Sequence, residues 1–357
     1  MRMYCKEYLQ EGVMMKVSVM TGLETMGWEE RPVPQLRGDQ VLVRVGAVGV
    51  CGSDLHYYEH GRIGNFVVKP PFVLGHEAAG TVVAAGKDVR HLEAGDRVAL
   101  EPGIACGKCE ACVSGKYNLC PDVKFFATPP VDGVFQEYVA HDARLCFKLP
   151  GNMSLVEGAL IEPFAVGLHA VSQGNARLGQ TAAVTGAGCI GLMSLLALRA
   201  QGVSRIFVIE TIARRLSKAR ELGATAVFDP SQADVVKEIN EATGGRGCDL
   251  VIETSGSEAA AQNAIHIARR GGRIVFVGYS PDGNVTLPLG RALDKELSFE
   301  TVFRYRHIYP IAIEAVSSGR ANIASVVTNE FSFDAIPEAM ARSCHEKGSI
   351  VKSVILF

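Results

Sequence analysis

A glycine-rich turn between an apolar strand and an apolar helix constrains the fold of this chain more than any other feature. Ala182–Val184 has the composition of a strand, and Ile190–Ala200 has that of a helix. Between them Gly186-Ala187-Gly188-Cys189-Ile190-Gly191 matches GxGxxG in the context that a dinucleotide site requires. The first two glycines permit a tight turn and close approach of a pyrophosphate, and the third lets the helix pack on the strand. The sequence therefore predicts a dinucleotide at this helix N-terminus, the alternative being a turn without a ligand.

An acidic residue follows the next predicted strand, Ile206–Ile209. Glu210 ends that strand about 20 residues beyond the glycines, where a carboxylate accepts hydrogen bonds from the adenosine ribose hydroxyls. Its charge would repel a 2′-phosphate, which favours NAD over NADP. Arg214 and Arg215 follow shortly and oppose this preference, because a phosphate binds to a cationic partner.

The chain changes its pattern near residue 179. Before residue 150, strand-like segments such as Val41–Val45, Gly80–Ala84 and Arg97–Leu100 are separated by glycines, which predicts an antiparallel, barrel-like domain. Beyond residue 179, strands alternate with helices of about ten residues, which predicts βαβ units and a parallel sheet. A length of 357 residues fits about two domains.

Charge and hydropathy narrow the class of protein. The net charge is −2 with no polybasic block, so binding to nucleic acid or to a membrane surface has little support. Met1 to Gln10 lack the apolar run of a signal peptide, and we expect no stretch of about 18 apolar residues. We therefore expect a cytoplasmic location.

Four of the ten cysteines lie close together in one predicted loop. Cys106, Cys109, Cys112 and Cys120 have the spacing of a closed tetrahedral Zn²⁺ site, which stabilises a fold rather than reacts. Disulfides or an iron–sulfur cluster are the alternatives. Most of the remaining cysteines are expected to be small buried apolar residues, with Cys51 as the exception.

A second set of donors is mixed. Cys51, His76, Glu77 and Glu162 provide the thiolate, imidazole and carboxylates of a catalytic Zn²⁺ site, which keeps one position open. Neighbouring residues of a strand point to opposite faces, so His76 and Glu77 reach one ion only if the chain turns, as Gly75 allows. The alternatives are a buried thiol, a structural histidine and a hydrogen-bonded buried carboxylate.

Two runs in this region resemble the zinc-dependent medium-chain alcohol dehydrogenases: Cys51-Gly52-Ser53-Asp54-Leu55-His56 and Gly75-His76-Glu77-Ala78-Ala79-Gly80. Three further runs resemble the sorbitol (polyol) dehydrogenase branch: Gly61-Arg62-Ile63-Gly64-Asn65-Phe66, Ala127-Thr128-Pro129-Pro130 and Val302-Phe303-Arg304-Tyr305. The resemblance extends from about residue 15 to the C-terminus. It implies a GroES-like β-barrel catalytic domain over residues 1–162 and 303–357. A Rossmann doubly wound parallel-sheet domain over 163–302 is implied as well, with the active site between the two and a homotetrameric assembly.

The resemblance also implies individual roles. Glu77 binds the catalytic zinc directly, although the residues alone leave Glu162 as an equal candidate; Glu162 holds water at the metal. Ser53 and His56 relay the proton, and a surface His56 without a role is the alternative. The cofactor contacts are Gly186, Gly188, Ile190, Gly191, Glu210 and Arg215. The residues implied to line the substrate pocket are Tyr57, Ile63, Phe66, Phe125, Arg304 and Tyr305.

The reaction implied is NAD-dependent oxidation of a secondary alcohol in a polyol to the ketose, with two zinc ions per chain. At the catalytic site the charge of Zn²⁺ lowers the pKa of a bound alcohol, and the nicotinamide accepts the hydride. Dehydrogenases for xylitol, galactitol, a diol or threonine are the alternatives within this class. A non-catalytic zinc-ribbon protein is the alternative outside it.

Overall fold

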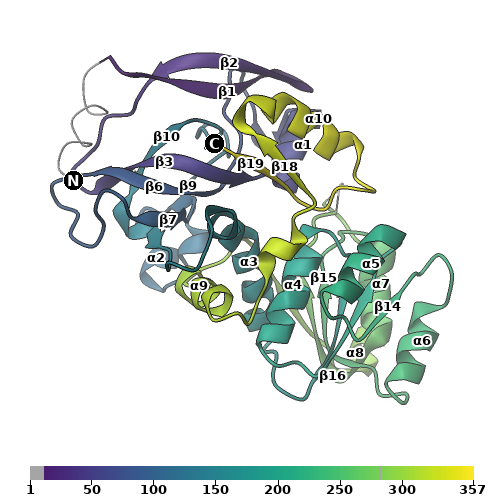
Figure 1. Ribbon diagram of the computed structural model, residues 1–357. Helices are drawn as coiled ribbons and strands as arrows, with labels where there is room; N and C mark the ends of the chain where they lie inside the picture. The colour runs from purple at the N-terminus through teal and green to yellow at the C-terminus, as the bar shows by residue number, and fades with distance from the viewer. Residues whose placement is uncertain (1–11, 281–282) are drawn as a thin grey trace. The chain divides into compact units, whose positions relative to one another are not determined.

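The computed structural model describes residues 12–280 and 283–357 (Figure 1). The segment Met1 to Gln10, in which we expected no signal peptide, lies outside the described residues, and so does Cys5 within it. The chain divides into two compact units. Unit 1 consists of the chain up to Glu162 together with Val327–Phe357, and unit 2 consists of Pro163–Val326. The C-terminal segment therefore belongs with the N-terminal domain, as the resemblance implied.

Unit 1 is built on an antiparallel sheet around β3 (Gln40–Gly49), which pairs with β6 (Glu77–Ala85), and β6 pairs in turn with β7 (Arg97–Leu100). The full order is β11-β7-β6-β3-β19-β18, and β10 also pairs with β3. Only β18 and β19 run parallel to each other. The remaining strands of this sheet are β10 (Tyr138–Asp142), β11 (Cys146–Lys148), β18 (Asn329–Ser332) and β19 (Ser353–Leu356). The predicted antiparallel domain is confirmed.

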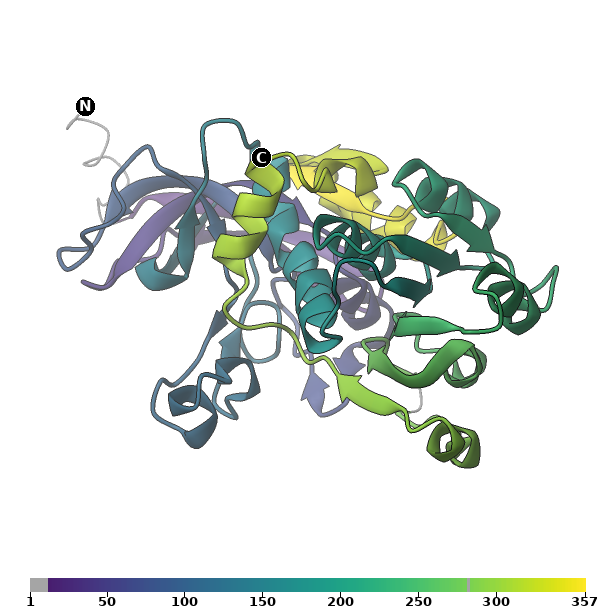
Figure 2. The ribbon, with the colours of Figure 1, turned by 90° about the horizontal axis from the view of Figure 1, so that it is seen from below.

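Smaller elements complete unit 1. Three hairpins are formed by β1 (Met14–Gly22) with β2 (Thr25–Pro32), β4 (Arg62–Ile63) with β5 (Phe66–Val67), and β8 (Gly103–Ile104) with β9 (Lys124–Phe125). Helix α1 (Gly52–His60) packs against α10 (Ile336–His345). The segment from β8 to β9, which carries α2 (Glu110–Val113) and the short helix η1 (Tyr117–Leu119), protrudes from the strands of its unit (Figure 2). We call residues 103–125 the cysteine lobe.

Unit 2 contains a six-stranded parallel sheet of order β14-β13-β12-β15-β16-β17 (Figure 1). The order reverses between β12 (Thr181–Thr185) and β15 (Cys248–Glu253), and every residue of these two strands is buried. Parallel strands covered on both faces read as such apolar runs, which is why the pattern could be read from the sequence. The other strands are β13 (Arg205–Ile209), β14 (Ala226–Phe228), β16 (Ala268–Phe276) and β17 (Ser298–Thr301). The predicted parallel sheet is confirmed.

The helices of unit 2 connect and cover these strands. Helices α4 and α7 both pack against β15, and α5 packs against β13 and β14. Their bounds, with those of the remaining helices, are α4 (Cys189–Ala200), α5 (Ala213–Glu221), α6 (Val235–Ala242), α7 (Glu258–Ile267), α8 (Leu289–Asp294), α9 (Tyr309–Ser317) and η3 (Ile323–Val326).

The second boundary between the units differs from the prediction. It lies between Val326 and Val327, whereas the sequence predicted it between residues 302 and 303. The physical reason is that η3 packs against α4 and so keeps the segment that contains α9 with unit 2.

Helix α3 (Leu155–Gln173) was not predicted. In length and composition it is apolar enough to cross a membrane, so the expectation that no such stretch exists is wrong. Most of the apolar window is buried inside the protein. Its apolarity therefore matches that of a core helix.

Candidate active site

Three of the predicted metal ligands meet at one point of unit 1. The ligand atoms of Cys51, His76 and Glu77 all lie within 4.8 Å of one another. Cys51 is the N-cap of α1, and Glu77 begins β6, where it pairs with Gly49 of β3. Gly75 has a φ of 86°, which is the turn expected to bring two neighbouring side chains to one ion. Thiolate, imidazole and carboxylate together fit a catalytic Zn²⁺ ion.

A buried carboxylate, Asp54, connects the two segments that carry these ligands. Its Oδ2 accepts a hydrogen bond from the backbone N–H of Cys51 at 3.0 Å, and its Oδ1 accepts one from Gly75 at 2.9 Å. The Oδ1 atom also lies 3.5 Å from Nδ1 of His76. Burial alone would lower the pKa of His76, but the charges of Asp54 and Cys51 raise it well above its usual value. This negative field favours a cation at the site.

A buried lysine from the far end of the chain contacts the same site. Lys352 donates from Nζ to Oε1 of Glu77 at 2.6 Å and to the carbonyl of Val50 at 3.0 Å. Its Nζ also contacts Oε2 of Glu77. Glu77 is therefore held by a fixed cation on one side while it faces Cys51 and His76 on the other.

Glu162 does not join this group of ligand atoms. It is buried on α3 and lies near a second buried carboxyl, that of Glu101. Burial raises the pKa of Glu101 to about 7; the hydroxyl of Tyr117 opposes this shift, and the charge of Glu162 adds to it. The structure thus places Glu77, rather than Glu162, among the donors around Cys51.

The two residues of the predicted proton relay lie on α1. Ser53 is partly buried, and His56 is exposed three residues further along. Residues three apart are neighbours on one face of a helix. The ring of His56 also meets that of His60 edge-on, at a centroid distance of 4.7 Å.

Four of the residues implied for the substrate pocket belong to unit 1. Tyr57 is buried on α1, and Phe125 is buried at β9, where its ring lies 5.7 Å from that of His76. Ile63 and Phe66 pair across the β4–β5 hairpin. Phe66 is 47% exposed, so its ring does not fill a core.

The other two residues, Arg304 and Tyr305, follow β17 in unit 2. Arg304 has a φ of 56°, a conformation that costs a residue with a side chain on the order of 1 kcal/mol and clusters at functional sites. Its guanidinium lies 4.8 Å from the ring centre of Phe303. Tyr305 is buried, with its ring 5.7 Å from that of Tyr309.

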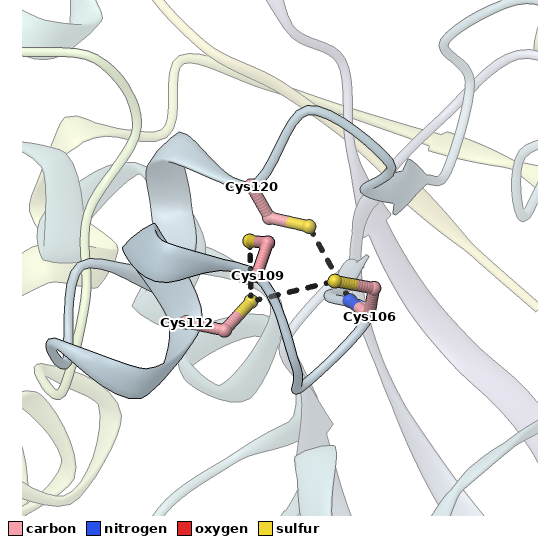
Figure 3. Close-up of side chains that lie close together, drawn as sticks. All are labelled: Cys106, Cys109, Cys112 and Cys120. Atoms are coloured by element: carbon pink, nitrogen blue, oxygen red, sulfur yellow. Dashed lines mark hydrogen bonds between the residues drawn. The ribbon is translucent and has the colours of Figure 1, made fainter.

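The four cysteines of the cysteine lobe converge, as Figure 3 shows. Their sulfur atoms lie within 4.8 Å of one another, and none of them is in a disulfide. The backbone N–H groups of Lys108 and Cys109 lower the pKa of Cys106 to about 6, whereas desolvation raises that of Cys112 to about 12. Four thiolates at this distance repel one another unless a cation joins them, so the set fits a closed Zn²⁺ site.

The glycine-rich turn of unit 2 has the conformation that its sequence predicts. Gly186 has a φ of 88°, and Gly188 is the N-cap of α4, with Ile190 in its first turn. A Cβ atom on Gly191 would lie only 2.0 Å from the carbonyl oxygen of Gly186. Thr254, after β15, donates to the carbonyl of Gly186 at 3.3 Å. The turn therefore lies where the strand order reverses, the position at which such sheets bind dinucleotides.

Glu210 lies beside this turn and is almost fully buried. Its Oε2 accepts a hydrogen bond from the N–H of Ala187 at 2.9 Å, and its Oε1 accepts one from the N–H of Ile212 at 3.1 Å. Arg215 lies with Nη1 3.8 Å from Oε2 of Glu210, whereas Arg214 is exposed. The structure thus pairs Arg215 with the acid and leaves Arg214 at the surface.

Three residues at the candidate site were absent from the sequence prediction: Asp54, Lys352 and Glu101. Asp54 follows Cys51 by three positions, the spacing of an N-terminal helix cap, and this signal could have found it. For Lys352 and Glu101 no local pattern exists, because their contacts join distant parts of the chain.

Comparison with known proteins agrees with this arrangement. Residues 37–151 match the family model of the alcohol dehydrogenase GroES-like domain, and residues 189–318 match that of zinc-binding dehydrogenase. The chain is 43% identical over 341 residues to sorbitol dehydrogenase of Bacillus subtilis, covering 96% of this chain and 97% of that protein. It is 41% identical over 343 residues to D-xylulose reductase A of Aspergillus oryzae, covering 94% and 95%. A solved structure from Sinorhizobium meliloti, described as a zinc-binding dehydrogenase bound to NADP, has a TM-score of 0.89 at 31% identity, covering 97% and 100%.

Proposed function

The chain belongs to the zinc-binding alcohol dehydrogenase family, and we propose that it oxidises a secondary alcohol of a polyol to a ketone with a nicotinamide dinucleotide as hydride acceptor. The observation that carries this proposal is the convergence of Cys51, His76 and Glu77. This set has both the soft and the hard donors of a catalytic zinc site, together with the turn that an open site requires.

When bound by Cys51, His76 and Glu77, a zinc ion acts as a Lewis acid that polarises the substrate hydroxyl. The residues of the chain do the rest. Asp54 fixes the orientation of His76, and Ser53 and His56 carry the hydroxyl proton outward along α1. Glu162, a buried carboxylate of α3, is proposed to hold water at the metal. His56 suits the end of such a path because its exposed imidazole exchanges protons with solvent near neutral pH.

The substrate is proposed to be a five- or six-carbon polyol resembling sorbitol. In unit 2, Arg304 and Tyr305 carry hydrogen-bonding groups of the kind that pair with polyol hydroxyls; in unit 1, Tyr57, Phe66 and Phe125 carry apolar surface of the kind that contacts a carbon chain. A site built to pair hydroxyl groups discriminates strongly against an alcohol that lacks them. Xylitol is the second candidate, because D-xylulose reductase A is a relative that spans nearly the whole chain.

We further propose NAD as the cofactor. Glu210 lies at the end of β13 beside the glycine-rich turn, where a buried carboxylate accepts ribose hydroxyls and repels a 2′-phosphate. The pairing of Arg215 with Glu210 supports this choice, since it reduces the positive charge offered to a phosphate. The NADP-bound relative makes NADP the alternative to test.

The remaining proposals concern the whole molecule. Two zinc ions per chain follow from the two donor sets. A cytoplasmic location is supported by the described cysteines, which are not joined in disulfides. A homotetramer is supported by exposed apolar side chains that an assembly would cover, namely Leu289 and Leu293 on α8 and Phe299 on the edge strand β17.

The deciding experiment is a steady-state screen of reduced-nicotinamide formation. Sorbitol, xylitol, galactitol, 2,3-butanediol, threonine and ethanol are each tested with NAD and with NADP. We expect the highest kcat/KM with NAD and a five- or six-carbon polyol, and a poor rate with ethanol. A higher kcat/KM for threonine or for the diol would overturn the assignment of substrate class.

A further inference from the structure

The cysteine lobe is linked to the main sheet of unit 1 by a tyrosine. Tyr117, in η1 between Cys112 and Cys120, donates from its hydroxyl to Oε1 of Glu101 at 2.7 Å. Glu101 directly follows β7 and is only 4% exposed. The lobe is therefore joined to the sheet by a partly buried hydrogen bond to a carboxyl.

Glu101 is fixed from its backbone as well. Its N–H donates to the carbonyl of Leu145 at 2.8 Å, and its carbonyl accepts from Nε2 of the fully buried His141 at 2.8 Å. The negative charge of Glu162 adds to the raised pKa of the Glu101 carboxyl. A change in the position of the Tyr117 hydroxyl therefore acts on Glu101, whose neighbour Pro102 accepts a hydrogen bond from the backbone N–H of Phe126, next to Phe125, at 3.2 Å.

The lobe meets that site a second time, at its other end. Phe125 closes the lobe through the pairing of β8 and β9, where it lies opposite Gly103. Its ring lies 5.7 Å from that of His76, and a Cβ atom on Gly103 would come within 3.1 Å of it. The lobe therefore contacts one candidate ligand, His76, directly through Phe125.

We propose that Tyr117 is a positioning residue: through its hydrogen bond to Glu101 it makes the geometry of the candidate catalytic site depend on the folded cysteine lobe. This inference rests on the proposed function for the location of the active site. The lobe is then more than a separate stabilising element, because its order is transmitted to the residues around Glu162 and His76.

The test compares Tyr117→Phe with Tyr58→Phe. The control removes a tyrosine hydroxyl that also makes one 2.7 Å hydrogen bond in unit 1, to the carbonyl of Glu24. Both proteins are loaded with zinc and then assayed, and a second sample carries cobalt(II) as a spectroscopic probe. The spectrum of the Cys51→Ala protein is subtracted to isolate the site around Cys51.

We expect Tyr117→Phe to retain two metal ions, to lower kcat about 10- to 100-fold, and to leave the KM for NAD unchanged. Its cobalt bands at the Cys51 site should shift, while those of Tyr58→Phe match the parent. If the cobalt spectrum and kcat of Tyr117→Phe both equal those of the parent, the proposal is wrong. The spectrum needs no substrate, so an inactive parent would refute the proposed function and leave this test intact.

A double mutant separates positioning through Glu101 from a direct effect. In a Glu101→Gln background, Tyr117→Phe should change kcat by less than threefold, because its charged acceptor is already gone. If the kcat effects of the two substitutions instead multiply in the double mutant, Tyr117 does not act through Glu101. Should Tyr117→Phe fail to fold, Glu101→Gln alone carries the test: it should shift the cobalt bands, and an unshifted spectrum would overturn the proposal.

Discussion

Lys352 and Glu77 form a buried ion pair beside the candidate catalytic site, with Nζ 2.6 Å from Oε1 and both side chains less than 3% exposed. Lys352 also donates to Val50, the residue before Cys51. One cation thus ties together the C-terminal strand, the start of β6 and the segment that carries the thiol. A metal ion and Lys352 would share the charge of the same carboxylate.

This pair predicts a stability that depends on metal. Lys352→Met leaves Glu77 buried without its cation, and breaking one partner of a buried pair costs about 3–5 kcal/mol. We expect a large loss of thermal stability in the presence of a chelator and a smaller loss with saturating zinc, since the metal compensates the carboxylate. The matched control is Lys347→Met, whose surface pair with Glu59 contributes about 0–1 kcal/mol. Equal losses with and without zinc would show that Glu77 does not bind the metal.

The two donor sets predict separable effects of cysteine substitutions. Cys51→Ala should abolish turnover, retain the fold and lower the zinc content by one equivalent. Cys109→Ser should also remove one equivalent but should lower the melting temperature first, because a closed site contributes folding energy. Metal analysis, calorimetry and an activity assay on both proteins distinguish the roles. A fully active Cys51→Ala protein would contradict the catalytic assignment.

The raised pKa of Glu101 predicts that the protein loses folding stability as the pH rises. Its pKa in the folded protein is raised to about 7, above the ordinary value of about 4.5, so the folded state favours the protonated carboxyl. This loss of folding free energy is absent below pH 4.5, grows as the pH rises towards 7 and stays constant above pH 7. Glu101→Gln should therefore match the parent near pH 4.5 and be more stable above pH 7, by on the order of 2–3 kcal/mol. Denaturant unfolding across this range checks it; a difference that shrinks with rising pH would refute it.

Glu210 predicts cofactor choice. Glu210→Ala should lower kcat/KM for NAD and raise that for NADP, shifting their ratio by about one to two decades, or about 1.4–2.8 kcal/mol. Glu210→Gln keeps an acceptor for Ala187 and lacks the charge, so it isolates repulsion of the 2′-phosphate. If the parent already uses NADP as well as NAD, the arginines dominate and the assignment must be reversed.

Arg304 predicts substrate selectivity. Arg304→Ala should lower kcat/KM for sorbitol by at least tenfold more than for a simple secondary alcohol, because a site that pairs hydroxyl groups loses binding only for substrates that carry them. The matched control is Arg306→Ala, which removes an arginine two positions further along. It should change kcat/KM for both alcohols by the same factor. Equal losses for both alcohols in Arg304→Ala would show that this side chain does not bind the polyol hydroxyls.

The sequence by itself determined those features that follow from local spacing. The glycines of residues 186–191 require a turn between strand and helix, and four cysteines within one short loop meet because few residues separate them. The parallel sheet was predictable for the same reason, since its buried strands are continuous apolar runs. The adjacent pair His76 and Glu77 needed only the turn at Gly75.

Tertiary structure alone decided which distant groups surround these motifs. Lys352 reaches Glu77 across 275 positions because β19 pairs with β3, and no spacing rule encodes a contact between strands joined by a whole second unit. The second boundary between the units was misplaced because packing of η3 against α4, rather than composition, assigns that segment. Nothing in the local sequence marks Glu101; burial raises its pKa, and the fold brings the Tyr117 hydroxyl to its carboxyl. Charge and burial depend on the whole fold, so Cys51, His76 and Glu77 could be predicted from the chain and Asp54 could have been found from its spacing, whereas Lys352 and Glu101 could not.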